Sequence, residues 1–173
     1  MDFAKHIRSV PDFPQKGIVF RDITTLLKNP AAFIASIDAF AEHFKDSGAQ
    51  VIIGPESRGF IFGTALAYKM RLPFVPVRKP GKLPAQTESE SYELEYGTDT
   101  IEIHQDAIDT GDKVLMIDDL LATGGTMQAA CRLVEKLGGE IIGIGFLIEL
   151  SFIPGRKKLE QYPIFTLIDY ESE

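Results

Sequence analysis

The segment Val114-Leu-Met-Ile-Asp-Asp-Leu-Leu-Ala-Thr-Gly-Gly-Thr126 decides which fold this sequence predicts. Its apolar beginning predicts a strand, and Asp118 and Asp119 end that strand. The small residues that follow predict a turn that enters a helix. At such a turn, free backbone N–H groups and the positive end of the helix dipole favour a bound phosphate. The turn contains Ala122, Thr123, Gly124, Gly125 and Thr126.

The two acids restrict what this turn could bind. No lysine follows the glycines, as a nucleotide-triphosphate loop requires, and the glycine spacing differs from the dinucleotide fingerprint. Carboxylates would repel the phosphate itself, so Asp118 and Asp119 are better suited to accept hydrogen bonds from the two hydroxyls of a ribose. The alternative is that Asp118 only caps the turn and the glycines only bend it.

Outward from this segment, short apolar strands alternate with helical stretches. Asn29 and Pro30 predict a helix start, and Phe40 lies on its apolar face. The predicted strands are residues 51–53, 74–77, 114–117 and 141–148, and the predicted helices are residues 2–9, 30–47, 60–70 and 126–137. Continuously apolar strands are typical of a parallel sheet covered by helices on both faces. The sequence therefore predicts an α/β fold and one domain spanning residues 1–173.

One segment breaks the α/β alternation. Tyr92, Leu94 and Tyr96 alternate with glutamates, and Ile101 and Ile103 do so beyond Gly97, which predicts an antiparallel hairpin. A long polar stretch, residues 80–91, precedes it. Such stretches are often lids over a site, although a solvated surface loop fits the composition equally well.

Bulk composition narrows the function classes. The formal charge of −7 disfavours nucleic acid as a partner, because such binding relies on Lys and Arg. No apolar run is long enough to span a bilayer. The single cysteine fits a reducing compartment, so we expect a cytoplasmic protein without a membrane partner.

Six stretches in order along the chain resemble the type I phosphoribosyltransferases, in particular the members that act on adenine. They are FPQKGIVFRDIT, GPESRGFIFG, RKPGKLP, SYELEYG, VLMIDDLLATGGTM and ELSFIPGRKKL. The resemblance implies that fold, with a mostly parallel central sheet, a small hood over residues 1–30 and a flexible hairpin lid over residues 79–104. It also implies transfer of the 5-phosphoribosyl group from 5-phosphoribosyl pyrophosphate (PRPP) to adenine, giving AMP and pyrophosphate.

The resemblance implies roles for the residues that would hold the donor. Asp118, Asp119 and the turn 122–126 would bind the ribose phosphate part. Glu56 and Ser57 would form a cis peptide that directs N–H groups at the pyrophosphate, and Arg58 would contact it. Cations from the edge of the lid would add positive charge there, although a solvated basic run is an equally good interpretation. These cations are Arg78, Lys79 and Lys82.

The resemblance also implies where the base binds. Phe20 would stack on the purine, backbone groups of Val19 and Arg21 would hydrogen-bond its edge, and Leu150 would pack nearby. Glu95 would act as the acid/base at the imidazole nitrogen of the purine and would oppose the positive charge of the ribose. From the alternation alone, Glu95 fits the wet face of a hairpin equally well.

Further expectations concern cofactors, partners and rival functions. The histidines, Cys131 and the carboxylates lack the spacing of a structural metal site, so Mg²⁺ carried by the pyrophosphate is expected. The family resemblance also implies a homodimer. Three rival functions remain at this point: an enzyme for a 6-oxopurine, a non-catalytic sensor of PRPP, and an inert α/β scaffold.

Overall fold

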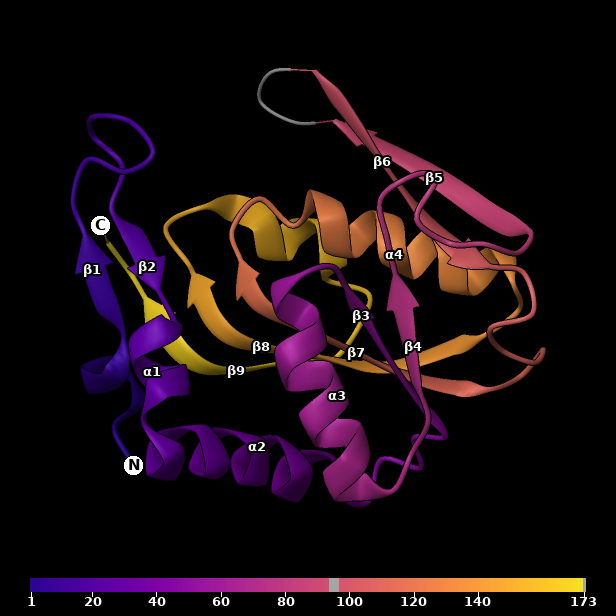
Figure 1. Ribbon diagram of the computed structural model, residues 1–173, viewed down its shortest axis with the longest axis horizontal. Helices are drawn as coiled ribbons and strands as arrows, with labels where there is room; N and C mark the ends of the chain where they lie inside the picture. Colours follow the sequence, from indigo (N-terminus) through magenta and orange to yellow (C-terminus); the bar gives the residue numbers. More distant parts are fainter. Residues whose placement is uncertain (94–96, 173) are drawn as a thin grey trace.

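The central feature of the computed structural model is a five-stranded parallel sheet with strand order β4-β3-β7-β8-β9 (Figure 1). The structure describes residues 1–93 and 97–172. The sheet strands are β3 (Val51–Pro55), β4 (Phe74–Val77), β7 (Lys113–Leu121), β8 (Glu140–Leu150) and β9 (Ile164–Tyr170). The predicted parallel α/β fold is therefore confirmed.

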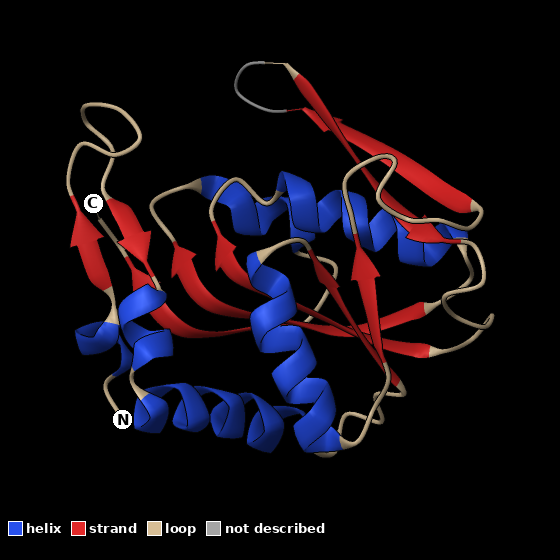
Figure 2. Cartoon of the chain, in the orientation of Figure 1, coloured by secondary structure: helices blue, strands red, loops and turns tan. Residues whose placement is uncertain are grey.

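Helices cover both faces of this sheet, as the continuously apolar strands predict (Figure 2). One face packs against α2 and α3, and the other packs against α4. The helices are η1 (Phe3–His6), α1 (Thr24–Lys28), α2 (Pro30–Phe44), α3 (Arg58–Met70), α4 (Gly125–Lys136) and η2 (Pro154–Leu159), where η marks a 3-10 helix. None of those within the described residues is long and apolar enough to cross a membrane.

Two antiparallel ribbons lie outside the sheet. The first pairs β1 (Arg8–Val10) with β2 (Phe20–Asp22), and Figure 1 shows it beside the chain's C-terminal end. The second pairs β5 (Thr87–Glu93) with β6 (Thr98–His104) and packs on α4. The predicted hairpin is thus confirmed, with its first strand starting inside the stretch predicted to be a polar loop.

The predicted helices are confirmed where a capping residue at the helix start is followed by an apolar face. At the start of α2, the Asn29 side chain accepts a hydrogen bond of 3.1 Å from the N–H of Ala32, and Pro30 occupies the first helical turn. The helix predicted over residues 2–9 is wrong in its second half, because that half pairs with β2 as strand β1. Pairing satisfies the backbone groups of a segment too short to form a stable helix alone.

Phe40 shows how α2 is fixed on the sheet. Its side chain is fully buried, and its ring packs edge-to-face against Phe165 with centroids 6.1 Å apart. A Cβ on Gly145 of β8 would lie 2.8 Å from Cδ1 of Ile117 and 3.1 Å from the Phe40 ring, so a side chain there would crowd both.

We predict that Phe40→Ala lowers the free energy of unfolding by about 3–5 kcal/mol, because it removes a large buried ring and leaves a cavity. Ile34→Ala, on the same helix but 58% exposed, should change it by less than about 0.5 kcal/mol. Urea unfolding followed by circular dichroism measures both. Equal losses in the two variants would contradict the assignment of Phe40 to the core.

Candidate active site

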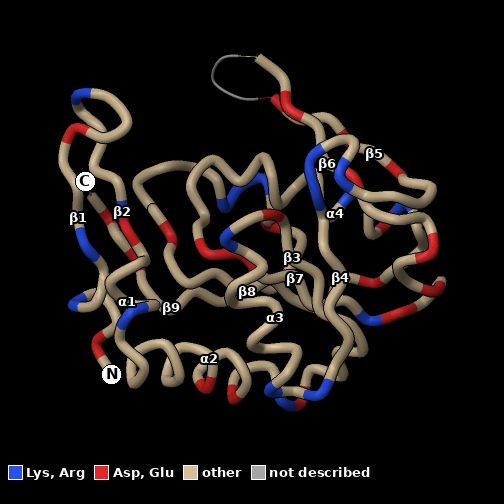
Figure 3. The backbone as a smooth tube through the Cα atoms, viewed as in Figure 1, with Lys and Arg blue, Asp and Glu red and all other residues tan. Residues whose placement is uncertain are grey.

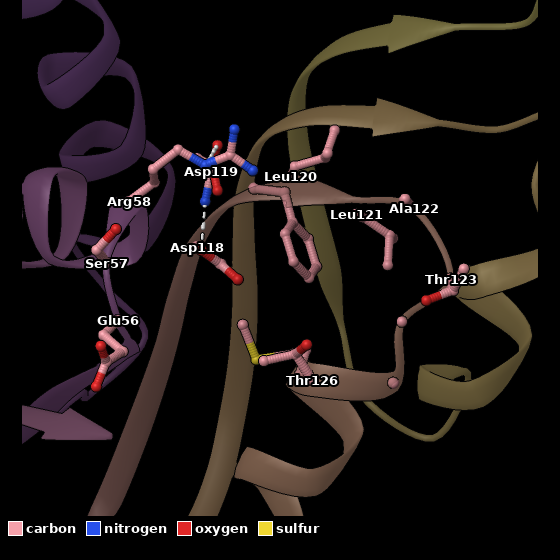
Figure 4. A pocket seen from close by; sticks show the side chains of 14 residues that line it. Glu56, Ser57, Arg58, Asp118, Asp119, Leu120, Leu121, Ala122, Thr123 and Thr126 are labelled. Atoms are coloured by element: carbon pink, nitrogen blue, oxygen red, sulfur yellow. Dashed lines mark hydrogen bonds and ion pairs between the residues drawn. The ribbon is translucent and has the colours of Figure 1, made fainter. Parts of the chain in front are cut away.

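A cavity of about 250 Å³ lies at the carboxyl ends of β3 and β7 (Figure 4). This is the edge of a parallel sheet at which α/β proteins place their ligands. The lining comes from the end of β7, the turn that follows it, the first residues of α4, the residues where β3 leads into α3, and one residue of β8. The lining residues are Glu56, Ser57, Arg58, Asp118, Asp119, Leu120, Leu121, Ala122, Thr123, Gly124, Gly125, Thr126, Met127 and Phe146.

The turn between β7 and α4 forms one wall of the cavity. The sequence predicts that the apolar strand ends at the two acids. In the structure, β7 continues to Leu121, so Asp118 and Asp119 lie within the strand. Gly124 precedes the helix with a φ of +74°, a conformation that side-chain-bearing residues rarely adopt. The helix α4 then begins at Gly125, and its first N–H groups have no partner within the helix.

The two aspartates both line the cavity but differ in their contacts. Asp119 is only 4% exposed, and its Oδ2 lies 3.0 Å from Nε of Arg58 as an ion pair. That contact lacks hydrogen-bond alignment, and the buried Oδ2 has no hydrogen-bond partner within the described part of the chain. Asp118 is only partly exposed, and its Oδ1 accepts a hydrogen bond of 2.8 Å from the N–H of Asp119.

Burial and mutual repulsion oppose charge on this pair. Desolvation, followed by the negative charge of Asp119, raises the pKa of Asp118 well above its usual range. Desolvation also raises the pKa of Asp119, although the charge of Arg58 opposes that rise. The Asp118 carboxyl packs so closely on Gly59 that a Cβ there would lie 2.9 Å from Oδ1. The surroundings of Asp118 therefore disfavour a negative charge on its carboxyl.

The loop after β3 carries the predicted cis peptide between Glu56 and Ser57, which confirms that expectation. Its backbone is anchored to β4, because the N–H of Glu56 donates to the carbonyl of Val77 at 2.8 Å. Ser57 precedes the first residue of α3, Arg58. Ser57 and Arg58 thus enter the cavity at the start of a helix.

The basic run after β4 is held by carboxylates beside the cavity. Glu56 accepts hydrogen bonds from the N–H of Lys79 at 2.7 Å and from Nζ of Lys82 at 2.6 Å, and lies 3.3 Å from Nε of Arg78. Nζ of Lys79 pairs with Asp99 of the hairpin. Burial alone would raise the pKa of Glu56, but the hydrogen bonds from Lys82 and Lys79 lower it. Figure 3 marks where acidic and basic residues lie along the backbone.

The predicted base-binding residues lie in β2 (Phe20 and Arg21), just before it (Val19) and at the end of β8 (Leu150). The Phe20 ring centroid lies 5.5 Å from the guanidinium carbon of Arg58, which also pairs with Asp119. Arg21 instead stacks over Tyr170, 3.9 Å from its ring centroid, and Leu150 pairs with Tyr170 across the sheet. The structure brings Phe20 next to Arg58, while these residues do not belong to the described lining of the cavity.

The predicted acid/base Glu95 lies outside the described residues. The hairpin that leads to it approaches the cavity through Tyr92, because a Cβ on Gly125 would lie 3.2 Å from the Tyr92 ring. The hydroxyl of Tyr92 donates to Asp99 at 3.1 Å. Sequence reasoning treated Tyr92 only as part of an alternation, since nothing in the sequence indicates that its ring meets the turn.

Comparisons with known proteins define the class of this site. A model of the phosphoribosyl transferase domain matches residues 22–169. An adenine phosphoribosyltransferase of Desulfitobacterium hafniense is 55% identical over 170 residues, covering 98% of this chain and 98% of the relative.

Solved structures agree. The crystal structure of adenine phosphoribosyltransferase from Thermoanaerobacter pseudethanolicus superposes with a TM-score of 0.93 at 55% identity and covers 96% of each chain. That of the Saccharomyces cerevisiae enzyme, in complex with adenine and an imino-altritol bisphosphate, gives 0.90 at 43% identity over 95% of this chain and 98% of that one. The fold is thus that of a type I phosphoribosyltransferase. Within that class, the chain belongs to the adenine phosphoribosyltransferase family.

The raised pKa of Asp118 gives a prediction about stability and pH. The folded state binds a proton on Asp118 more tightly than the unfolded state does, because the carboxyl of the unfolded chain has a pKa near 3.8. The free energy of unfolding therefore falls as the pH rises from about 3.8 through the raised pKa of the folded state. Asp118→Asn should remove that loss and raise the Tm of the ligand-free protein at neutral pH, by about 2–4 °C for each kcal/mol relieved.

Thermal unfolding over a pH series, from acid to mildly alkaline, measures this effect. Asp106→Asn, at an exposed surface position, serves as the control and should follow the wild-type curve. A curve for Asp118→Asn that runs parallel to the wild-type curve would show that the carboxyl titrates normally.

Proposed function

We propose that this chain catalyses transfer of the 5-phosphoribosyl group from PRPP to adenine, giving AMP and pyrophosphate in purine salvage. The observation that carries this proposal is the cavity in which Asp118 and Asp119, the turn 122–126 and Arg58 converge. Membership of the adenine phosphoribosyltransferase family supports adenine as the acceptor base.

The ribose 5-phosphate part of the donor binds the wall formed by β7 and α4. N–H groups at the start of α4 and the hydroxyls of Thr123 and Thr126 bind the phosphate. Asp118 and Asp119 accept hydrogen bonds from the two ribose hydroxyls, which compensates their burial. In the absence of ligand, Asp119 Oδ2 is buried without an aligned donor in the part of the chain described, and a ribose hydroxyl supplies one.

The pyrophosphate leaves toward the loop after β3. Arg58 and the backbone N–H groups of the Glu56-Ser57 loop stabilise its growing negative charge. Arg78, Lys79 and Lys82 join them by exchanging Glu56 and Asp99 for pyrophosphate oxygens. Their present pairing keeps them within reach of the loop that binds the leaving group.

The purine binds above the ribose. Phe20 stacks on its ring, the backbones of Val19 and Arg21 hydrogen-bond its edge, and Leu150 packs against it. The C1–O bond to pyrophosphate breaks, its electron pair leaves with the pyrophosphate, and the purine nitrogen bonds to C1. Glu95 takes the proton from that nitrogen.

Mg²⁺ fits this site as an ion carried by the donor. Among residues 1–93 and 97–172, no group of three or more His, Cys, Asp or Glu is arranged to hold a metal. The cavity nevertheless offers the carboxylates and hydroxyls that a hard cation accepts as occasional ligands, and Mg²⁺ is commonly held by substrate phosphates with one or two carboxylates. When bound, it spreads the negative charge of the pyrophosphate.

The remaining parts of the proposal concern organisation. We propose one phosphoribosyltransferase domain over residues 1–173, a hood over residues 1–30 and a lid over residues 79–104. The protein acts as a cytoplasmic homodimer on small-molecule substrates, without nucleic acid or membrane partners. The acidic formal charge of −7 and the single cysteine support this setting.

Incubation with PRPP, Mg²⁺ and each purine in turn tests the activity. We expect AMP with adenine and little or no nucleotide with hypoxanthine, guanine or xanthine, measured by chromatographic separation of the products. Nucleotide formed only with hypoxanthine would overturn the assignment of the base. No nucleotide with any purine would favour a sensor of PRPP.

Asp119→Asn tests the role proposed for the acid pair. Hydrogen bonds to a charged group contribute roughly 1.5–3 kcal/mol, so the affinity for PRPP should fall about 10- to 100-fold. Calorimetric titration with PRPP measures it, and circular dichroism should show an unchanged fold. Asp106→Asn serves as the surface control, and unchanged affinity in Asp119→Asn would remove the assignment of the ribose hydroxyls to this carboxylate.

A further inference from the structure

The segment that follows β8 presses directly on the back of the turn between β7 and α4. A Cβ on Gly155 would lie 1.9 Å from the carbonyl oxygen of Ala122 and 2.9 Å from the carbonyl carbon of Thr123. A Cβ on Gly124 would in turn lie 2.6 Å from the carbonyl oxygen of Gly155. The two backbones are thus in contact with no room for a side chain on either, and the position of one fixes the position of the other.

The residue after Gly155, Arg156, forms an ion pair with the buried carboxylate of Glu149. Arg156 donates from Nε to Oε1 of Glu149 at 2.7 Å and from a terminal nitrogen to Oε2 at 2.5 Å, a two-pronged contact. The Glu149 side chain is 5% exposed and the Arg156 side chain is 47% exposed. Glu149 pairs with Leu121 across the sheet, so the carboxylate is fixed beside the residue that leads into the turn.

Other contacts connect the same segment to the far side of the turn. Within the segment, the N–H of Ile153 donates to the carbonyl of Leu150 at 2.9 Å. At its end, the Gln128 side chain on α4 donates to the carbonyl of Lys158 at 3.2 Å. The turn is therefore enclosed by a short clamp, residues 149–158, which starts at β8 and finishes on α4.

We propose that Glu149 and Arg156 are positioning residues for the phosphate-binding turn. Their ion pair seats Gly155 against Ala122 and so holds the backbone of the turn in the form that accepts the 5-phosphate. This proposal rests on the proposed function, because it assigns a phosphate to that turn. Neither side chain touches the donor; both act through the backbone of Gly155.

Arg156→Ala tests the proposal. Loss of the pair frees Gly155 to move away, and displacements near 1 Å at a site can cost on the order of 100-fold. We expect the KM for PRPP and the Kd for ribose 5-phosphate to rise about 10-fold or more, with kcat at saturating PRPP within about 3-fold of wild type, because binding rather than chemistry is affected. Arg156→Lys keeps the positive charge but cannot make both hydrogen bonds to Glu149, so its KM for PRPP should lie between those of the wild type and Arg156→Ala.

Two further variants separate positioning from general stability. Lys69→Ala breaks an exposed ion pair between α3 and Asp38 of α2, and it should leave the KM for PRPP and the Kd for ribose 5-phosphate unchanged. The double variant Glu149→Gln, Arg156→Ala removes the uncompensated buried charge, so its Tm should recover while its KM for PRPP stays raised. This double variant keeps the test decisive even if Arg156→Ala alone unfolds.

The outcomes distinguish this proposal from the proposed function. Failure of the wild-type protein to form AMP would contradict the proposed function, whereas the present proposal is judged on an active wild-type protein. The positioning proposal would be overturned if Arg156→Ala kept the wild-type KM for PRPP and Kd for ribose 5-phosphate. It would also be overturned if both constants returned to wild-type values in the double variant. An equal loss in kcat and in affinity for both substrates, in step with Tm, would also overturn it.

Discussion

Asp118 and Asp119 stand side by side near the carboxyl end of β7, in a setting that opposes charge on both of them. Desolvation raises the pKa of each carboxyl, and the negative charge of Asp119 raises the pKa of Asp118 further. The N–H of Asp119 compensates Asp118 in part, and the ion pair with Arg58 compensates Asp119 but leaves its Oδ2 without an aligned donor in the described part of the chain. A site of this kind costs the protein stability, and the ribose hydroxyls that we propose as ligands would supply the missing donors.

Arg58 links this acid pair to the rest of the site. Its guanidinium lies 3.0 Å from Asp119 through Nε and 5.5 Å from the ring centroid of Phe20 through its central carbon. The residue that we propose for the pyrophosphate therefore lies beside both the acid that we propose for the sugar and the ring that we propose for the base.

The sequence predicts those parts of the fold in which local signals and tertiary packing agree. The strand–turn–helix around Gly124, the cap at Asn29 and the alternation in the hairpin all meet this condition, and the structure confirms them. Strand β9 and the helix α1 were not predicted. A short segment such as residues 24–28 has little helical preference of its own, and packing of Leu26 into the core decides its form.

The site shows the same division. Residue types near a glycine turn indicate phosphate and ribose, so Asp118, Asp119 and the turn itself can be predicted. A contact between two backbone segments far apart in the sequence cannot be predicted in this way. A glycine such as Gly155 is common in loops of every kind, so its presence alone does not indicate the contact. Its significance comes from the carbonyl of Ala122, 33 residues earlier by the numbering, which occupies the place where a Cβ would stand. Sequence patterns report what a side chain prefers, and at Gly155 the determining fact is the absence of one.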